Sequence, residues 1–118
     1  MAIYRENKEK LRKTLLGHST VRLTVNCYLG TIVNVETQDV EFTCAESKAI
    51  GDEVQLKGNR IKVTGTPRTP EGEEIRVEHI FDSPSGTKTY TFPDDYTGSP
   101  PYNPTDTNVT YIFYMNFD

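Results

Sequence analysis

Residues 109–117 alternate like a β-strand but carry apolar side chains on both faces. One face holds only large apolar or aromatic side chains, those of Val109, Tyr111, Phe113, Met115 and Phe117. The other face adds Ile112 and Tyr114, so little of this strand is polar. At an open sheet edge such a strand would template aggregation. We therefore expect it to lie in the middle of a β-fold, or at a boundary where a second chain covers it.

Two-residue alternation of apolar and polar side chains begins near residue 20 and continues to the end of the chain. The expected strands are residues 20–28, 31–36, 40–44, 53–56, 60–64, 74–81, 87–92 and 109–117. Residues 57–60 are typical of a tight hairpin turn between the fourth and fifth of these strands. About seven to eight short strands with short connections predict a mainly β fold, an antiparallel small barrel or sandwich.

Residues 3–16 have a helical spacing of apolar side chains instead. Tyr4, Leu11 and Leu15 fall on one line, and Gly17 is a suitable stop signal. This pattern predicts one short N-terminal helix whose apolar stripe is too narrow to be stable without a surface to lie on. The segment is also basic, because residues 1–35 carry six Lys or Arg and two Glu.

Residues 93–108 form a long connection, rich in Pro, Gly, Asp and Tyr, between the antiparallel β body of residues 20–92 and the last strand. Connections of this length in compact domains tend to be functional or disordered. Its four prolines reduce the entropy lost on ordering, and Tyr96 and Tyr102 can act as anchors. We expect an ordered loop that packs along the domain or across a partner.

The length of 118 residues fits one domain over residues 1–118, and the net charge of −4 argues against a protein that coats phosphate backbones. The N-terminus does not resemble a signal peptide, and no apolar run is long enough for a membrane span. We therefore expect a soluble, cytoplasmic protein. Cys27 and Cys44 fall on the apolar faces of their strands, which predicts buried, reduced thiols. A cross-strand disulfide, which needs an oxidising compartment, is the alternative.

No group of residues has the spacing of a catalytic, metal or cofactor site. The histidines and cysteines contain no close pair that would suggest zinc: His18, Cys27, Cys44 and His79. The acidic and amide residues at the long loop lack the spacing of a calcium loop: Asp94, Asp95, Asp106 and Asn108. We expect His79 to point away from the core. No metal, cofactor or catalytic residue is predicted, and an enzyme without a recognisable motif is a weak alternative.

The apolar last strand, the Tyr/Pro loop and the basic N-terminal segment each need a surface to cover them. We therefore predict a non-enzymatic protein-interaction or assembly domain that binds a partner protein or, more specifically, forms a homo-oligomer. The predicted contact residues are Tyr96, Tyr102, Tyr111, Phe113 and Tyr114, assisted by Arg5, Lys8 and Arg12. The alternative is a small β-barrel that binds single-stranded nucleic acid or a small nucleotide through Arg60, Lys62 and Arg76.

Overall fold

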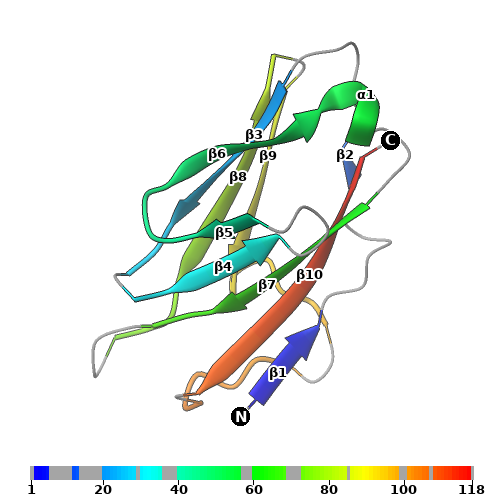
Figure 1. Ribbon diagram of the computed structural model, residues 1–118. Helices are drawn as coiled ribbons and strands as arrows, with labels where there is room; N and C mark the ends of the chain where they lie inside the picture. Colours follow the sequence, from blue (N-terminus) through cyan, green and yellow to red (C-terminus); the bar gives the residue numbers. More distant parts are fainter. Residues whose placement is uncertain are drawn as a thin grey trace.

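Two β-sheets face each other across one hydrophobic core, so the predicted mainly β fold is confirmed (Figure 1). The computed structural model describes residues 2–5, 12–13, 20–28, 30–35, 40–56, 60–68, 73–84, 86–98, 101–106 and 108–117. Its elements are β1 (Ala2–Arg5), β2 (Arg12–Lys13), β3 (Thr20–Asn26), β4 (Ile32–Val35), β5 (Val40–Phe42), β6 (Ser47–Asp52), α1 (Glu53–Leu56), β7 (Arg60–Thr66), β8 (Val77–Ser83), β9 (Gly86–Phe92) and β10 (Val109–Phe117).

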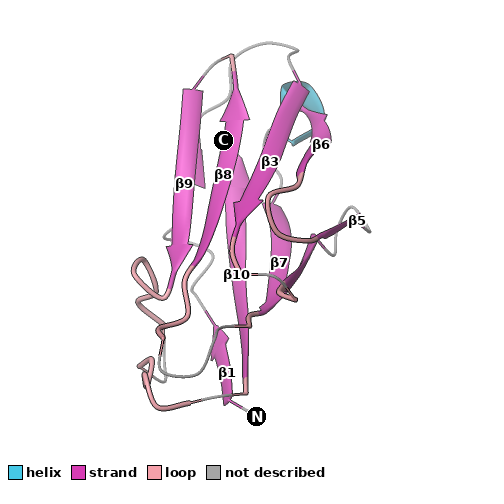
Figure 2. Cartoon of the chain, turned by 90° about the vertical axis from the view of Figure 1, so that its left-hand side faces the viewer, coloured by secondary structure: helices cyan, strands magenta, loops and turns pink. Residues whose placement is uncertain are grey.

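The described residues form a six-stranded sheet and a four-stranded sheet. The six-stranded sheet has the order β1-β10-β7-β4-β5, with β2 also paired to β10, and the four-stranded sheet has the order β6-β3-β8-β9. Figure 2 shows β9, β8 and β3 side by side, with β10 and β7 of the other sheet beyond them. Among the strands that the structure describes, the two sheets are not joined and do not close into a barrel. Of the two architectures expected, the sandwich is therefore the one that describes this fold.

β10 lies inside the six-stranded sheet and has the bounds predicted for the last strand. It pairs antiparallel with β7 on one side and parallel with β1 and β2 on the other. Tyr111, Phe113 and Met115 project into the core and are at most 1% exposed. The Phe113 ring centroid lies 4.1 Å from that of Tyr90 and 4.8 Å from that of His79, both on the opposite sheet. This strand therefore supplies the aromatic centre that joins the two layers.

The helix predicted over residues 3–16 is wrong wherever the structure describes that segment. Ala2–Arg5 is β1 and Arg12–Lys13 is β2, both in parallel pairing with β10, while residues 6–11 and 14–16 lie outside the described residues. An isolated helix with a narrow apolar stripe gains little stability, whereas the backbone edge of β10 offers hydrogen bonds. The strand also buries Tyr4, which is 2% exposed. Non-local pairing therefore overrides the local helical pattern.

The segment before β7 also differs from the sequence prediction. Ser47–Asp52 forms β6, which the sequence did not predict, and Glu53–Leu56 is a single helical turn where a strand was expected. The Asp52 backbone N–H donates to Gln55 Oε1 at 3.1 Å, the reciprocal hydrogen bond of a capping box. Gly51 turns the chain with a φ of 143°, which side-chain-bearing residues rarely adopt. The hairpin expected at residues 57–60 therefore lacks its first strand.

Candidate protein-interaction surface

The structure separates the five aromatic residues predicted to contact a partner. Tyr111 and Phe113 are 1% and 0% exposed and belong to the core of this chain. Tyr114 is half-buried on the outer face of the six-stranded sheet, because it alternates with these two along β10. Tyr96 and Tyr102 are half-buried in the loop after β9. A partner can reach only the last three, so the buried pair has a structural role.

Tyr96 and Tyr102 pack around the ring of Tyr4, which lies in β1. Their ring centroids are 5.4 Å and 5.2 Å from that of Tyr4. The Tyr4 hydroxyl accepts a hydrogen bond from the Asn103 N–H at 3.0 Å and donates one to the Asp106 carboxylate. Burial, followed by the bond to Asp106, raises the pKa of Tyr4, which therefore stays neutral. These contacts hold β1 against the loop and so fix the side chains that β1 presents to solvent.

Five residues form one row across the outer face of the six-stranded sheet. The strand registers place Arg5 beside Ile112, Ile112 beside Thr64, Thr64 beside Asn34, and Asn34 beside Glu41. Paired residues in neighbouring strands project to the same side, and core residues alternate with this row along the strands, among them Tyr4, Tyr111, Val63, Val33 and Phe42. The row therefore begins with a cation on β1 and ends with an anion on β5, and both end residues are exposed.

A second row on the same face carries two exposed isoleucines. Ile3 pairs with Thr110 at one side of the sheet, and Ile32 pairs with Thr66 at the other. Ile3 is 44% and Ile32 is 37% exposed, and they are two of the three large hydrophobic side chains exposed among the described residues. The third is Tyr28, which lies beyond the end of β3. Exposed apolar side chains are thus concentrated on this face.

We call this surface the outer face. Its residues are Ile3 and Arg5 of β1, Thr110, Ile112 and Tyr114 of β10, Lys62, Thr64 and Thr66 of β7, Ile32 and Asn34 of β4, and Glu41 of β5. It mixes aliphatic and hydroxyl side chains with three charged ones, Arg5 and Glu41 at its margins and Lys62 on the middle strand. This composition suits contact with another protein surface, because the apolar groups gain from burial and the marginal charges select an orientation.

The basic residues considered in the sequence do not share one sheet. Arg60 and Lys62 lie on β7, whereas Arg76 precedes β8 of the four-stranded sheet. The Arg76 guanidinium lies 3.8 Å from the carboxylates of both Glu78 and Asp94. The nucleic-acid alternative therefore stays a prediction, with its three basic residues divided between β7 and the segment before β8.

Of the N-terminal basic residues, Arg5 contributes to the outer face. Arg12 lies in β2, paired in register with Asn116 of β10. Lys8 lies outside the described residues. The proposed electrostatic assistance at this surface therefore rests on Arg5.

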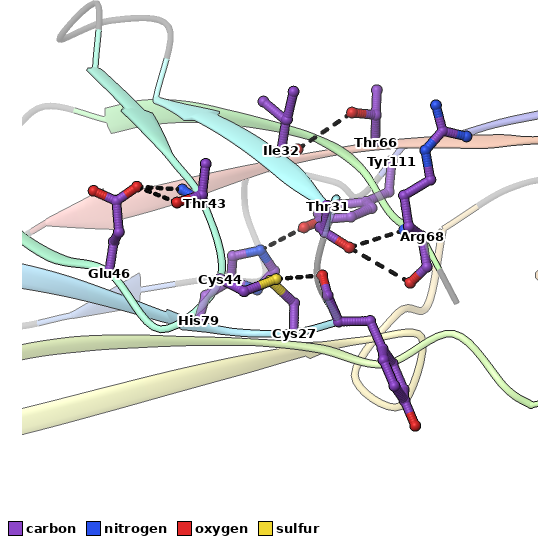
Figure 3. The surroundings of a disulfide bond; sticks show 11 residues. Cys27, Thr31, Ile32, Thr43, Cys44, Glu46, Thr66, Arg68, His79 and Tyr111 are labelled. Atoms are coloured by element: carbon purple, nitrogen blue, oxygen red, sulfur yellow. Dashed lines mark hydrogen bonds between the residues drawn. A yellow bond between two sulfur atoms is a disulfide. The ribbon is translucent and has the colours of Figure 1, made fainter. Parts of the chain in front are cut away.

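His79 is fully buried, so the prediction that it points away from the core is wrong. It has the same strand parity as Val77 and Phe81, both of which are core residues, and this parity was visible in the sequence. Its Nδ1 lies 2.8 Å from the Tyr90 carbonyl oxygen. Its Nε2 lies 2.7 Å from the Tyr111 hydroxyl, and Figure 3 shows this second contact. Burial lowers the pKa of His79 to about 4. This neutral, enclosed imidazole cannot serve as a base for an external substrate.

Cys27 and Cys44 form a disulfide, so the prediction of two reduced thiols is wrong (Figure 3). Cys27 follows β3 and Cys44 follows β5, so the bond links the two sheets. Their Cα atoms are 5.1 Å apart, within the range that a disulfide requires. The Ala45 N–H donates to the Val25 carbonyl oxygen at 2.7 Å and holds the β5–β6 turn against the end of β3. Alternation along each strand predicts the side on which its cysteine lies. Whether the two cysteines come close enough to bond depends on how the two sheets pack.

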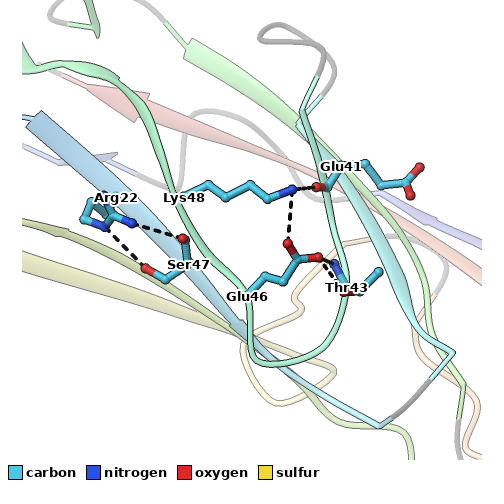
Figure 4. Close-up of polar contacts among 6 residues, drawn as sticks. All are labelled: Arg22, Glu41, Thr43, Glu46, Ser47 and Lys48. Atoms are coloured by element: carbon cyan, nitrogen blue, oxygen red, sulfur yellow. Dashed lines mark hydrogen bonds and ion pairs between the residues drawn. The ribbon is translucent and has the colours of Figure 1, made fainter.

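The same turn is held by a polar network around Glu46 (Figure 4). Glu46 Oε1 accepts hydrogen bonds from the Thr43 backbone N–H, at 2.8 Å, and from the Thr43 hydroxyl. Lys48 Nζ lies 3.2 Å from the second carboxylate oxygen and donates to the Glu41 carbonyl oxygen at 2.6 Å. The bonds from Thr43, with Lys48, lower the pKa of Glu46 to about 2. β5, which carries the acidic end of the outer face, is thereby fixed to β6.

Two further results bear on function. Within the described residues, no group of three or more His, Cys, Asp or Glu side chains is arranged to hold a metal ion, and no helix is long and apolar enough to cross a membrane. Comparisons of the chain with protein-family models, with curated proteins and with solved structures returned no match. The surface geometry is therefore the basis for a functional proposal.

Proposed function

We propose that this protein is a binding domain that docks onto another protein through its outer face. The observation that carries this proposal is the placement of Ile3 and Ile32, both more than a third exposed, on the same face of the six-stranded sheet. Exposed large aliphatic side chains on one face favour burial against a second surface, even where two strands separate them. Tyr114, half-buried on β10, extends this surface, whereas Ile112 on the same strand is only 8% exposed and adds little apolar area.

The outer side of the four-stranded sheet is a weaker candidate, because its polar groups already bond to one another. The Arg22 guanidinium donates to the Ser47 carbonyl oxygen and the Thr24 hydroxyl to Ser47 Oγ, both at 3.0 Å (Figure 4 shows the Arg22–Ser47 contact). Asn26 donates to the carboxylate of Glu78 at 2.9 Å. A partner on that side would have to replace satisfied hydrogen bonds, which offers little net gain.

Tyr96 and Tyr102 pack against the core side of β1, the strand that carries Ile3 and Arg5 on the outer face. Both pack on Tyr4, whose neighbours Ile3 and Arg5 point the other way, onto the outer face. In the proposal the tyrosine loop therefore positions β1, and Tyr114 is the aromatic residue that a partner contacts directly.

The disulfide removes one of the arguments for the cytoplasmic location expected from the sequence. A cytoplasmic location was inferred together with reduced cysteines, but the Cys27–Cys44 bond favours an oxidising compartment, where disulfides persist. We therefore propose that the binding function is exercised in such a compartment. Alkylation of the protein taken directly from its natural cells, with and without reductant, tests this: two free thiols before reduction would contradict it.

The binding proposal is tested by native mass spectrometry of the protein purified from its natural cells, combined with variants of the outer face. We expect a protein complex that dissociates when Ile3→Asp or Ile32→Asp is introduced. Thr89→Asp, on the exposed side of β9, is the matched control and should leave the complex intact. Complexes that survive both isoleucine variants, or that dissociate equally with Thr89→Asp, would overturn the assignment of the outer face.

A further inference from the structure

We infer that the partner is a second copy of this chain, docked outer face to outer face across a two-fold axis that runs along β7. This inference rests on the proposed function and names the partner for the same face. It is carried by the opposite charges at the two ends of one cross-strand row, Arg5 on β1 and Glu41 on β5.

β7 is the middle strand of the order β1-β10-β7-β4-β5, so Arg5 and Glu41 each lie two strands from it. With neighbouring strands about 4.8 Å apart, each charge belongs to a strand about 10 Å from β7. A half-turn about an axis parallel to β7, in the plane of the interface, exchanges the two sides of the sheet. Arg5 of each copy then faces Glu41 of the other, so the same contact forms twice.

The other two-fold arrangement of the two faces has its axis across the strands. That axis would place Arg5 opposite Arg5 and Glu41 opposite Glu41, which opposes association because like charges repel. The row therefore favours the axis along β7, because it forms two opposite-charge contacts against one like-charge approach, that of Lys62 on β7 to its counterpart. Arg5 and Glu41 lie at the margins of the interface, where exposed ion pairs contribute more to orientation than to affinity.

Both charges are available for this contact. Arg5 and Glu41 are exposed, and no ion pair within the described residues engages either one. The Glu41 backbone carbonyl accepts a hydrogen bond from Lys48, but its carboxylate points away from that lysine (Figure 4). The acidic group is therefore directed to solvent.

The apolar side chains also come together about this axis. Ile3 lies two strands to one side of β7 and Ile32 lies one strand to the other side. After the half-turn, Ile32 of the second copy is offset sideways from Ile3 of the first by one strand spacing, about 5 Å. Aliphatic side chains at that lateral offset interdigitate, as they do between packed sheets. The face is narrow, which predicts a dimer that dissociates on dilution.

Charge reversal tests this arrangement by sedimentation velocity over a concentration series at low ionic strength, where exposed ion pairs are least screened. Arg5→Glu and Glu41→Arg should each weaken self-association at least tenfold, because each places like charges at both margins. An equimolar mixture of the two variants should form a heterodimer, since both contacts regain opposite signs. The double variant should recover the homodimer for the same reason.

Matched controls carry the same changes of charge away from the outer face. Arg22→Glu, on β3, and Asp94→Arg, beyond β9, should leave self-association unchanged. Circular dichroism and thermal unfolding establish that each variant is folded.

The mixture of Arg5→Glu and Glu41→Arg is the decisive sample. If it dimerises no more strongly than either variant alone, the two-fold pairing is overturned, even if the natural chain dimerises. A natural chain that stays monomeric at the highest concentration would overturn the second copy as partner, whereas the proposed function would survive if Ile32→Asp still released a different protein.

Discussion

The imidazole Nε2 of His79, on β8, lies 2.7 Å from the hydroxyl oxygen of Tyr111, on β10, and this hydrogen bond joins the two sheets inside the core. A carbonyl oxygen can only accept, so Nδ1 carries the imidazole proton and donates it to Tyr90. Nε2 is then the acceptor, and Tyr111 is the donor. The neutral tautomer therefore satisfies both ring nitrogens without any group from solvent.

Acid should destabilise the fold through this histidine. The unfolded chain takes up the proton near pH 6.5, whereas the folded chain resists it until about pH 4. The stabilisation is thus complete above pH 6.5, is lost as the pH falls toward 4, and amounts to about 3 kcal/mol. Denaturant unfolding at pH 7.5, 5.5 and 4.5 measures it. His79→Gln should flatten the curve over this range, and an equal slope in the variant would contradict the assignment to His79.

Removal of the Tyr111 hydroxyl should cost stability without changing the shape of the core. Tyr111→Phe leaves Nε2 of His79 as a buried acceptor with no donor, a loss of about 1 to 3 kcal/mol. Tyr28→Phe is the matched control, because the Tyr28 hydroxyl bonds to Glu73 at the exposed surface, where water can replace the lost hydrogen bond. Urea unfolding of the two variants provides the comparison. Equal losses would show that the hydroxyl of Tyr111 has no special role.

The prediction from sequence succeeded where structure is local and failed where it depends on distant pairing. β10 was predicted with its observed bounds, because its alternation and its apolar character are both contained in nine consecutive residues. Ala2–Arg5 was assigned to a helix, since the strand forms only through hydrogen bonds to β10, more than a hundred residues away. Ser47–Asp52 has few strand-favouring side chains and forms β6 because β3 pairs with it.

The same distinction applies to the candidate site. Alternation along β10 places Ile112 and Tyr114 opposite the core residues, and this was readable from the sequence. The position of Arg5 in one row with Glu41 depends on which strands are neighbours, which alternation does not determine. The disulfide depends in the same way on how the two sheets approach each other.

Reduction of the Cys27–Cys44 bond should destabilise the fold. The bond closes a loop that contains β4 and β5, and the chain-entropy relation gives about 3 kcal/mol for a loop of this length. Guanidinium unfolding with and without dithiothreitol measures the difference. The variant with both Cys27→Ser and Cys44→Ser should match the reduced protein and be insensitive to the reductant. Equal midpoints for the oxidised and reduced protein would refute a stabilising role.

Asp95 should protect the open edge of β9. The Thr91 N–H donates to Asp95 Oδ2 at 2.6 Å, and the Asp95 N–H donates to the Thr91 carbonyl oxygen at 2.7 Å, so one residue satisfies both backbone groups at this point. β9 is the last strand of its sheet, and unpaired edge groups recruit strands from other chains. Asp95→Ala should cost about 1 kcal/mol and increase aggregation on mild heating, measured by light scattering.

Asp95→Asn separates the hydrogen bond from the charge. The amide oxygen of asparagine still accepts from Thr91, so this variant should lose less stability than Asp95→Ala. If the asparagine variant aggregates as readily as the alanine variant, the negative charge at the edge is the protecting feature, because like charges keep edges apart. If neither variant aggregates more than the natural chain, Asp95 does not guard β9, and its bonds to Thr91 serve only to shape the turn after the strand.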